Sequence, residues 1–295
     1  MSEIFFSIII PTYNRADLLP KTLKSLVNQT YTHYEIIVVD DGSTDNTSEI
    51  MKEWVSEKVI YFPKINEERA VARNTGARLA RGEYLNFFDS DDIAYPNHLQ
   101  VAANFINETK NPEIFHLGHD YKTPEGDIIR EVSNFTSENL NAELIQGNIL
   151  SCNGVFIRKD IALKYHFNED RQLSASEDWE LWLRLAAVYS IKYNNTITST
   201  IVNHEMRSVL VINKEKLIKR QEAFIKHLFD DEAAKEKYNS YKNLFISDCY
   251  TYISLHLALT KNHKKDVILY IWKAFAKRPA VLSRKRFWAS LKHLI

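Results

Sequence analysis

The regular alternation of apolar runs and amphipathic stretches over the first hundred residues is the feature that most constrains this chain. Residues 7–11 and 35–40 are continuous runs rich in Ile and Val, which is typical of strands buried on both faces of a sheet. Between them leucines recur at helical spacing, and the alternation continues through an expected strand at 58–62, a helix at 67–80 and a strand at 83–88. This pattern predicts a doubly wound, mostly parallel α/β sheet.

Three carboxylates stand at the end of the strand at 83–88. Asp89, Asp91 and Asp92 are close enough to repel one another, so a partly buried cluster must take up protons, attract cations or hold a metal ion. In open α/β sheets, ligands bind beyond the carboxyl ends of the strands. The cluster therefore indicates either a ligand site or an ordinary Asp-rich turn, and both interpretations stay open at this point.

The first strand is not followed by a glycine-rich loop, and the whole chain has only 7 glycines. It thus lacks the backbone nest with which dinucleotide folds and P-loop enzymes hold phosphate. A phosphate-bearing ligand would need Mg²⁺ or Mn²⁺ on the acidic cluster instead. Asp41, after the second strand, could accept hydrogen bonds from a nucleobase. Ser43 or Thr44 could cap the next helix, and Asp45 could equally belong to that N-cap region.

The composition is that of a globular chain, since 45% of the 295 residues are hydrophobic and 26% are charged. Cys152 and Cys249 are far apart and show neither zinc-ligand nor disulfide spacing, which fits a reducing cytoplasm. The N-terminal stretch lacks the pattern of a signal peptide, and no apolar run approaches the ~20 residues of a membrane span. We therefore expect a cytoplasmic location.

Charge and periodicity both change near residue 210, and from residue 213 the pattern is helical almost to the end. Residues 1–200 carry 19 basic and 29 acidic side chains, whereas residues 201–295 carry 19 and 9. From residue 261 onward there are ten Lys or Arg against one Asp, interspersed with Trp and Phe. Basic and aromatic residues together suit an anionic membrane surface, such as the inner face of a plasma membrane, or a polyanion. A helical cap with a solvated basic face and a dimerisation helix are the alternatives.

Five segments in these regions resemble the motifs of glycosyltransferase family 2, whose members have the GT-A fold. They occur in the family's order and at its usual separations over about residues 5–210. Each is weak alone, but five in order are a strong signal. The segments are SIIIPTYNR at 7–15, IVVDDGSTD at 37–45, ARNTG at 72–76, FDSDD at 88–92 and EDWELWLR at 177–184.

The resemblance implies a GT-A catalytic domain over residues 1–210, with a nucleotide-binding half at about 1–95 and an acceptor half at about 96–210. Residues 211–295 would be a helical region outside the resemblance. Carried over by position, the motifs imply contacts to a nucleotide sugar and to a divalent metal. The nucleotide-sugar residues would be Pro11, Thr12, Tyr13, Arg15, Asp41, Arg73 and Asp91, and the metal residues Asp89, Asp91, Asp92 and His204.

Asp178 matches the catalytic base of the family. In an inverting transfer, a carboxylate accepts the proton of an acceptor hydroxyl as that hydroxyl attacks the anomeric carbon. The same residue is also an ordinary acid at a helix start, where the macrodipole favours it. Trp179 and Trp182 are expected to face the core. His204, as a lone histidine, is either structural or near the diphosphate.

The resulting hypothesis is an inverting glycosyltransferase that requires Mg²⁺ or Mn²⁺ and transfers a sugar, from a UDP-sugar as the expected donor, to a glycan or lipid-linked saccharide. The inverting outcome rests on the resemblance alone. Nucleic acid is not an expected partner, whereas peripheral membrane contact through the C-terminal region and a homodimer are both possible. The alternatives are a sugar nucleotidyltransferase, against which the missing glycine-rich loop counts, and a non-catalytic nucleotide-sugar-binding or scaffold protein.

Overall fold

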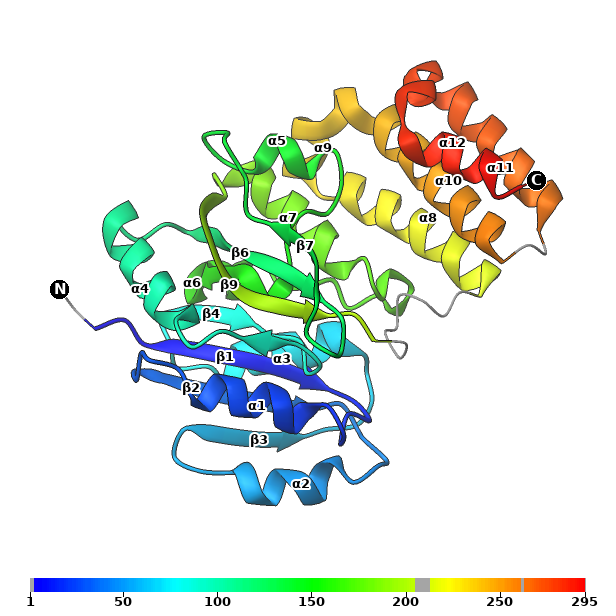
Figure 1. Ribbon diagram of the computed structural model, residues 1–295. Helices are drawn as coiled ribbons and strands as arrows, with labels where there is room; N and C mark the ends of the chain where they lie inside the picture. The colour runs from blue at the N-terminus through cyan, green and yellow to red at the C-terminus, as the bar shows by residue number, and fades with distance from the viewer. Residues whose placement is uncertain (1–2, 205–212, 261–262, 295) are drawn as a thin grey trace. The chain divides into compact units, whose positions relative to one another are not determined.

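The computed structural model describes residues 3–204, 213–260 and 263–294 (Figure 1). The chain forms two compact units: the first is Met1–Arg171 with Glu177–Met206, and the second is Gln172–Ser176 with Arg207–Ile295. The boundary predicted near residue 210 lies outside the described residues. No helix within the described ranges is long and apolar enough to cross a membrane.

Within the described residues, the first unit is built on a sheet of nine strands with the order β3-β2-β1-β4-β8-β6-β9-β5, and β7 pairs with β6. β3, β2, β1 and β4 are all parallel, as the alternation in the sequence predicts. Beyond β4 the sheet is mixed, because β8 runs antiparallel to both β4 and β6. The strands are β1 (Phe6–Thr12), β2 (Tyr34–Asp40), β3 (Val59–Pro63), β4 (Tyr84–Phe87), β5 (Ile93–Ala94), β6 (Ile114–Lys122), β7 (Ile128–Val132), β8 (Val155–Arg158) and β9 (Lys192–Val202).

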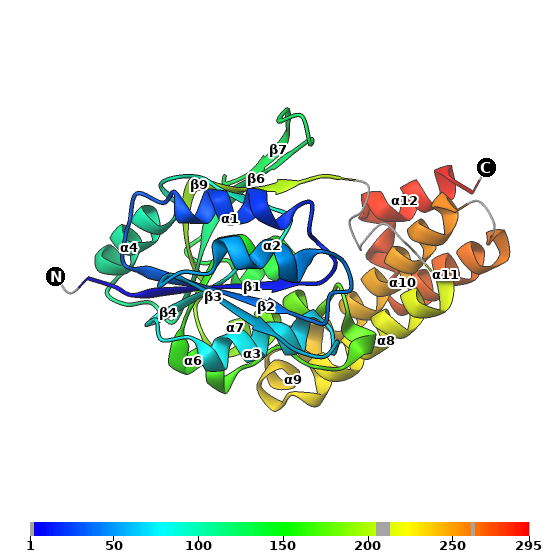
Figure 2. The same ribbon diagram turned by 90° about the horizontal axis from the view of Figure 1, so that it is seen from below.

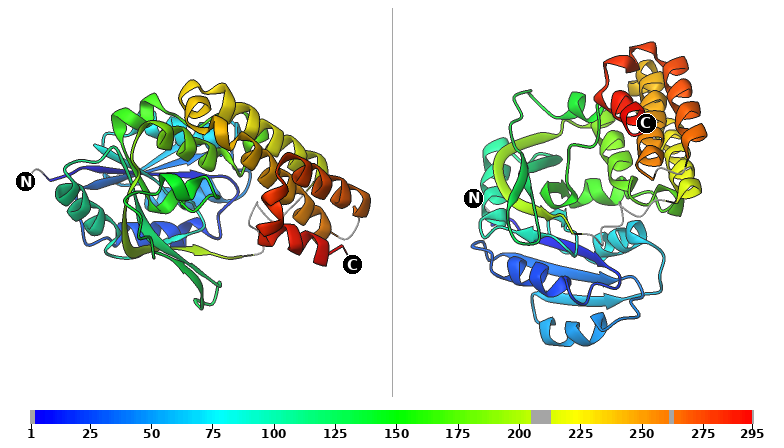
Figure 3. Two further views of the ribbon diagram at one scale, coloured as in Figure 1. Left: turned by 90° about the horizontal axis from the view of Figure 1, so that it is seen from above. Right: turned by 45° about the vertical axis from the view of Figure 1, so that its right-hand side comes forward.

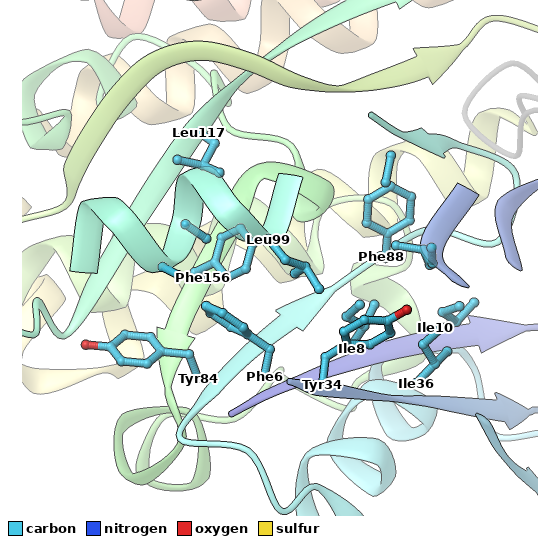
Figure 4. Packing of buried hydrophobic residues seen from close by; sticks show 14 of the residues in the cluster. Phe6, Ile8, Ile10, Tyr34, Ile36, Tyr84, Phe88, Leu99, Leu117 and Phe156 are labelled. Carbon is cyan, nitrogen blue, oxygen red and sulfur yellow. The ribbon is translucent and has the colours of Figure 1, made fainter. Parts of the chain in front are cut away.

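Helices cover both faces of this sheet. α1 and α4 lie on one face and α3 and α6 on the other (Figure 2). The core beneath α1 and α4 is formed by alternate residues of β1 and β2, such as Ile8 and Ile36, which meet Leu99 and other buried side chains (Figure 4). The helical elements here are α1 (Leu19–Val27), α2 (Thr47–Trp54), α3 (Arg69–Leu79), α4 (His98–Thr109), α5 (Asn141–Leu144), η1 (Cys152–Gly154), α6 (Lys159–Lys164) and α7 (Glu177–Val188). The short η2 (Arg171–Leu173) begins in the first unit and ends in the second.

Two local predictions were wrong or incomplete. α2 is not capped by Ser43 or Thr44, because Asp45 Oδ1 accepts from the backbone N–H of Thr47 at 3.0 Å. Of the two tryptophans on α7, Trp182 is fully buried as predicted, but Trp179 is only half-buried and donates its indole N–H to a carbonyl of α5.

The second unit is helical. The apolar α10 packs against α8, α11 and α12, and Leu257 of α10 and Val267 of α11 lie in the shared core. In Figure 3 these are the yellow-to-red helices. The elements are α8 (Lys214–Asp230), α9 (Glu232–Tyr238), η3 (Asn239–Tyr241), α10 (Lys242–Leu259), α11 (Lys264–Lys277), η4 (Pro279–Ser283) and α12 (Lys285–Lys292).

Candidate active site

The loops after β1 and β2 are joined at the carboxyl ends of these parallel strands. The backbone N–H of Asp41 donates to the carbonyl of Thr12 at 2.8 Å. Further along, the backbone N–H of Asn14 donates to Ser43 Oγ at 2.9 Å, and Asn14 Oδ1 accepts from the backbone N–H of Thr44 at 2.8 Å. The two loops that sequence reasoning assigned to a nucleotide therefore form one continuous surface.

The four residues predicted to line a nucleotide at the end of β1 differ in exposure. Pro11 and Thr12 are buried, and Thr12 Oγ1 has no hydrogen-bond partner among the described residues. Tyr13 is 46% exposed. Arg15 Nε lies 3.8 Å from Asp91 Oδ2. A buried hydroxyl without a partner requires an explanation, and a bound ligand would provide one.

Asp41 is buried and organises the loop between β3 and α3. Its Oδ1 accepts from Lys64 Nζ at 2.7 Å and from the backbone N–H of Glu67 at 2.9 Å, and its Oδ2 accepts from the backbone N–H of Glu68 at 2.8 Å. Glu68 has φ +80°, a backbone conformation that is costly for a side chain with a Cβ. A carboxylate oxygen can accept two bonds, so Oδ2 retains an acceptor position for a nucleobase N–H.

Asp92 is the most buried carboxylate after β4. Its Oδ2 accepts from Asn153 Nδ2 at 2.7 Å, and its Oδ1 accepts from the backbone N–H of Val202 at 2.9 Å. Its carbonyl accepts from Thr22 Oγ1 at 2.8 Å. Asp92 thus ties the turn after β4 to η1, β9 and α1, while its assignment as a metal ligand stays a prediction.

Asp91 points toward two other side chains that the motifs single out. Its Oδ2 lies 3.0 Å from His204 Nε2 and 3.8 Å from Arg15 Nε. Among the described residues no group of three His, Cys, Asp or Glu side chains is placed to hold a metal ion. Asp91 and His204 are nevertheless a suitable pair of ligands, because Mg²⁺ and Mn²⁺ are commonly bound by one or two protein groups together with substrate phosphates.

Arg73, predicted to lie near a nucleotide, joins the acidic turn after β4 to the start of α7. Its Nη2 donates to Asp89 Oδ1 and its Nη1 to Glu177 Oε1, both at 2.8 Å. We call these three residues the Arg73 bridge. Gly76 allows this arrangement, since a Cβ there would stand 2.3 Å from Ile9 Cγ2 and force α3 away from β1. The bridge sets the predicted metal region beside the predicted base.

Glu177 and Asp178 are neighbours in sequence but have opposite shifts in pKa. Burial alone would raise the pKa of Glu177, but the charges of Arg69 and Arg73 hold it below its usual value. Burial, and then the charge of Glu177, raise the pKa of the half-buried Asp178 to about 6. Glu177 is therefore a structural anion, and Asp178 can exchange a proton near neutral pH.

Asn148 is a site residue that sequence reasoning missed. Its Nδ2 donates to Asp178 Oδ2 at 2.9 Å, and the backbone N–H of Trp179 donates to Oδ1 at 2.7 Å. Both bonds favour the ionised carboxylate and lower its pKa. No motif marks Asn148, because an isolated Asn in a loop carries no recognisable spacing.

Several solved structures have an architecture similar to that of this chain. TarS of Staphylococcus aureus in complex with UDP-GlcNAc is 19% identical, with a TM-score of 0.69 over 98% of this chain and 88% of that chain. A mannosyltransferase of Pyrobaculum calidifontis in complex with GDP-Man and Mn²⁺ is 16% identical, with a TM-score of 0.57 over 98% and 84%. The curled, mostly parallel sheet flanked by helices is the GT-A fold, which confirms the fold predicted from the motifs.

Sequence comparison gives the family. Residues 7–165 match glycosyl transferase family 2, which is more than half of the chain. An uncharacterized glycosyltransferase of Rickettsia felis is 35% identical over 63% of this chain and 31% of its own length. The minor teichoic acid biosynthesis protein GgaB of Bacillus subtilis is 27% identical over 90% of this chain and 28% of that protein. The chain thus spans about a third of the length of these relatives, and it belongs to glycosyl transferase family 2.

Proposed function

We propose that this chain is an inverting glycosyltransferase that transfers a sugar from a UDP-sugar to a hydroxyl of a glycan or lipid-linked saccharide. The proposal rests on the raised pKa of Asp178 and on the groups that orient its carboxyl. A carboxyl with a pKa near 6 is mostly ionised at neutral pH, yet basic enough to accept the proton of an attacking hydroxyl. Asn148 and the Trp179 N–H orient it, and the Arg73 bridge fixes the start of its helix.

The departing nucleoside diphosphate would be held at the other end of the Arg73 bridge. There Asp91 and His204 would bind Mn²⁺ or Mg²⁺, which as a Lewis acid neutralises the charge that grows on the leaving group. Arg15 stands beside them as an additional cation. The Mn²⁺ of the mannosyltransferase and the UDP-GlcNAc of TarS support a metal-dependent enzyme that uses a nucleotide sugar.

The acceptor is a polymeric or lipid-linked saccharide that is extended during cell-surface glycan synthesis. The relative in minor teichoic acid biosynthesis supports a polymeric or lipid-linked acceptor, and another relative is the chondroitin synthase of Escherichia coli, 29% identical over 67% of this chain and 29% of that protein. Two free, buried cysteines fit a reaction on the cytoplasmic side of the membrane. Hexosyl and N-acetylhexosaminyl donors are both candidates.

The proposal is tested by incubating the purified full chain with a panel of UDP-sugars, Mn²⁺ and glycan or lipid-linked acceptors. Release of UDP and the anomeric configuration of the product are measured. We expect transfer from one donor class with inversion at the anomeric carbon. Asp178→Asn should lower turnover by about 10²–10⁴-fold while the thermal stabilisation by UDP and Mn²⁺ is retained.

A second incubation with UTP and sugar phosphates, followed by measurement of pyrophosphate, separates the two alternatives. A sugar nucleotidyltransferase would form pyrophosphate from UTP and a sugar phosphate and would not release UDP. A non-catalytic binding protein would be stabilised by nucleotide sugars without any turnover. An Asp178→Asn variant as active as the wild type would overturn the assignment of the base.

A further inference from the structure

The middle of the solvent-facing side of α11 is apolar, with exposed lysines near both ends of the helix. Ile268, Leu269 and Trp272 are 56%, 45% and 64% exposed, and their spacing of three and four residues places them on one side of the helix. The opposite side of α11 is also apolar, with Val267 and Tyr270 buried in the core. We call Ile268, Leu269 and Trp272 the α11 face. α11 also carries four lysines and Asp266, so it is not hydrophobic all round. Three large apolar side chains exposed side by side nevertheless form a patch of the kind that marks an interaction site.

Exposed aromatic and aliphatic groups continue from the α11 face toward α12. The ring of Trp272 lies 6.0 Å from that of Phe275, which packs against the cluster containing Phe287. The ring of Phe287 in turn lies 5.5 Å from that of Trp288, which is 56% exposed. Tryptophan at the boundary between apolar and polar surface is typical of proteins that enter the interfacial layer of a membrane.

The charge around these groups is strongly positive. Nine Lys or Arg residues lie between residues 263 and 294, against one acidic side chain, Asp266. Asp266 is already paired, because its Oδ2 accepts from Lys214 Nζ at 2.7 Å and lies 3.6 Å from His263 Nδ1. Asp248 of the neighbouring α10 lies 3.4 Å from Arg284 Nη2, so these two acids reduce but do not remove the surplus of positive charge. The α11 face is therefore set in an environment that attracts anions.

A cavity of about 280 Å³ lies between α10, the start of α11 and the end of α12. Lys264, Lys292, His263 and His293 contribute its polar lining, and Val267 is among its apolar lining residues. Lys264 precedes Ile268 by four residues, so the cationic side of the cavity and the α11 face adjoin on the same helix. This combination suits a phosphate group whose attached chains are apolar.

We propose that the second unit binds the surface of an anionic phospholipid bilayer, with the α11 face in the interfacial layer and lipid phosphate at Lys264 and Lys292. A second copy of the chain would bring two strongly basic surfaces together, which disfavours it as the occupant. A polyanion without apolar groups would leave the α11 face in water. An anionic bilayer accounts both for the exposed apolar residues of the α11 face and for the positive charge around them.

The test is flotation of the full chain with vesicles of phosphatidylcholine alone or of phosphatidylcholine with 30–40% phosphatidylglycerol. We expect the chain to float with the anionic vesicles, and the bound fraction to fall with added salt. Ile268→Glu should lower the partition coefficient by about tenfold or more, since a large apolar side chain no longer leaves water. Lys264→Gln with Lys292→Gln should lower it by about fivefold per lysine, and only for anionic vesicles.

The matched control is Ile128→Glu, which makes the same substitution at an isoleucine of similar exposure, 58%, on β7 of the first unit. It should float like the wild type. The proposal is overturned if the wild type does not float with anionic vesicles, or if Ile128→Glu and Ile268→Glu lower binding equally. A circular dichroism spectrum of each variant confirms that it is folded. Membrane binding is measured without glycosyl transfer, so its outcome is independent of the proposed activity.

Discussion

The Arg73 bridge and the α11 face break the usual distribution of side chains in opposite ways. Arg73 and Glu177 are 2% and 3% exposed although both are charged, whereas Ile268 and Trp272 are more than half exposed although both are apolar. In the bridge, each charge meets an opposite charge at 2.8 Å within the first unit. On the α11 face, no comparable compensation is present within the described part of the second unit.

This difference indicates two kinds of functional surface. The bridge is formed by ion pairs within the chain, so it can hold Asp89 and the start of α7 in position before any ligand binds, which is the preorganisation that catalysis requires. Two of its buried atoms, Arg73 Nε and Glu177 Oε2, have no hydrogen-bond partner among the described residues. The apolar side chains of the α11 face are exposed to water, so only a partner that covers them can bury their surface. The predictions below test whether the bridge is self-sufficient and whether the α11 face is dispensable for folding.

The largest effect is expected from Arg73→Met. Removing the guanidinium leaves Glu177 buried without its 2.8 Å partner, which should lower the free energy of unfolding by about 3–5 kcal/mol. Urea unfolding followed by circular dichroism measures this change. Arg158→Met is the control, because Arg158 pairs with the exposed Asp160 and should cost about 0–1 kcal/mol.

A double variant, Arg73→Met with Glu177→Met, sharpens this result. It removes both buried charges and should recover most of the lost stability, as apolar replacements of buried ion pairs commonly do. Recovery of stability without recovery of turnover would show that the bridge serves positioning rather than folding. A double variant as unstable as Arg73→Met alone would contradict the view that an unpaired Glu177 causes the loss.

The parts of the first unit that could be predicted from sequence are those with local causes. The strands β1, β2 and β4 follow from continuous runs of Ile, Val, Leu and Phe, and the position of the acidic residues after β4 follows from the chain order. Parallel strands then place their carboxyl ends at one edge of the sheet. The fold and the approximate position of the site could therefore be predicted without knowing which distant residues contact one another.

The partners of the acidic residues could not be predicted, because they come from distant parts of the chain. Asp92 is bonded to Asn153 and Val202, which are 61 and 110 positions away, so three adjacent carboxylates acquire different environments. The same holds for Ser43, which does not cap α2: its hydroxyl accepts from the backbone N–H of Asn14, 29 positions away. The sequence shows that residues near the C-terminus are rich in basic and aromatic side chains. It does not show which side of α11 is exposed.

The second prediction concerns the pH dependence of turnover. Asp178 must be ionised to accept a proton, and its pKa of about 6 means that it is increasingly protonated as the pH falls below that value. We expect kcat/KM to be level above this pKa and to fall about tenfold per pH unit below it. A level profile down to pH 4.5, under conditions where the chain stays folded, would remove Asp178 as the base.

The third prediction isolates the one exposed support of Asp178. Asn148 donates to Oδ2 and lowers the pKa of the carboxyl, so Asn148→Ala should raise it and move the acid limb of the profile to higher pH. Loss of one hydrogen bond corresponds to about a two- to tenfold decrease in kcat/KM near pH 6, with a smaller decrease at pH 8. An equal loss at both pH values would indicate that Asn148 contacts the acceptor rather than tuning the base.

The smallest effect is expected on the α11 face, where Ile268→Glu should change the free energy of unfolding by no more than about 0.5 kcal/mol. The side chain is more than half exposed, and the new carboxylate would stand three and four residues from Lys265 and Lys264, an arrangement that stabilises helices slightly. Leu257→Ala is the contrast, because Leu257 is buried in the core of the same unit and should cost about 2–5 kcal/mol. If Ile268→Glu were as damaging as Leu257→Ala, the α11 face would belong to the core of the chain itself. If it leaves folding intact and abolishes flotation, the exposed apolar residues serve binding alone.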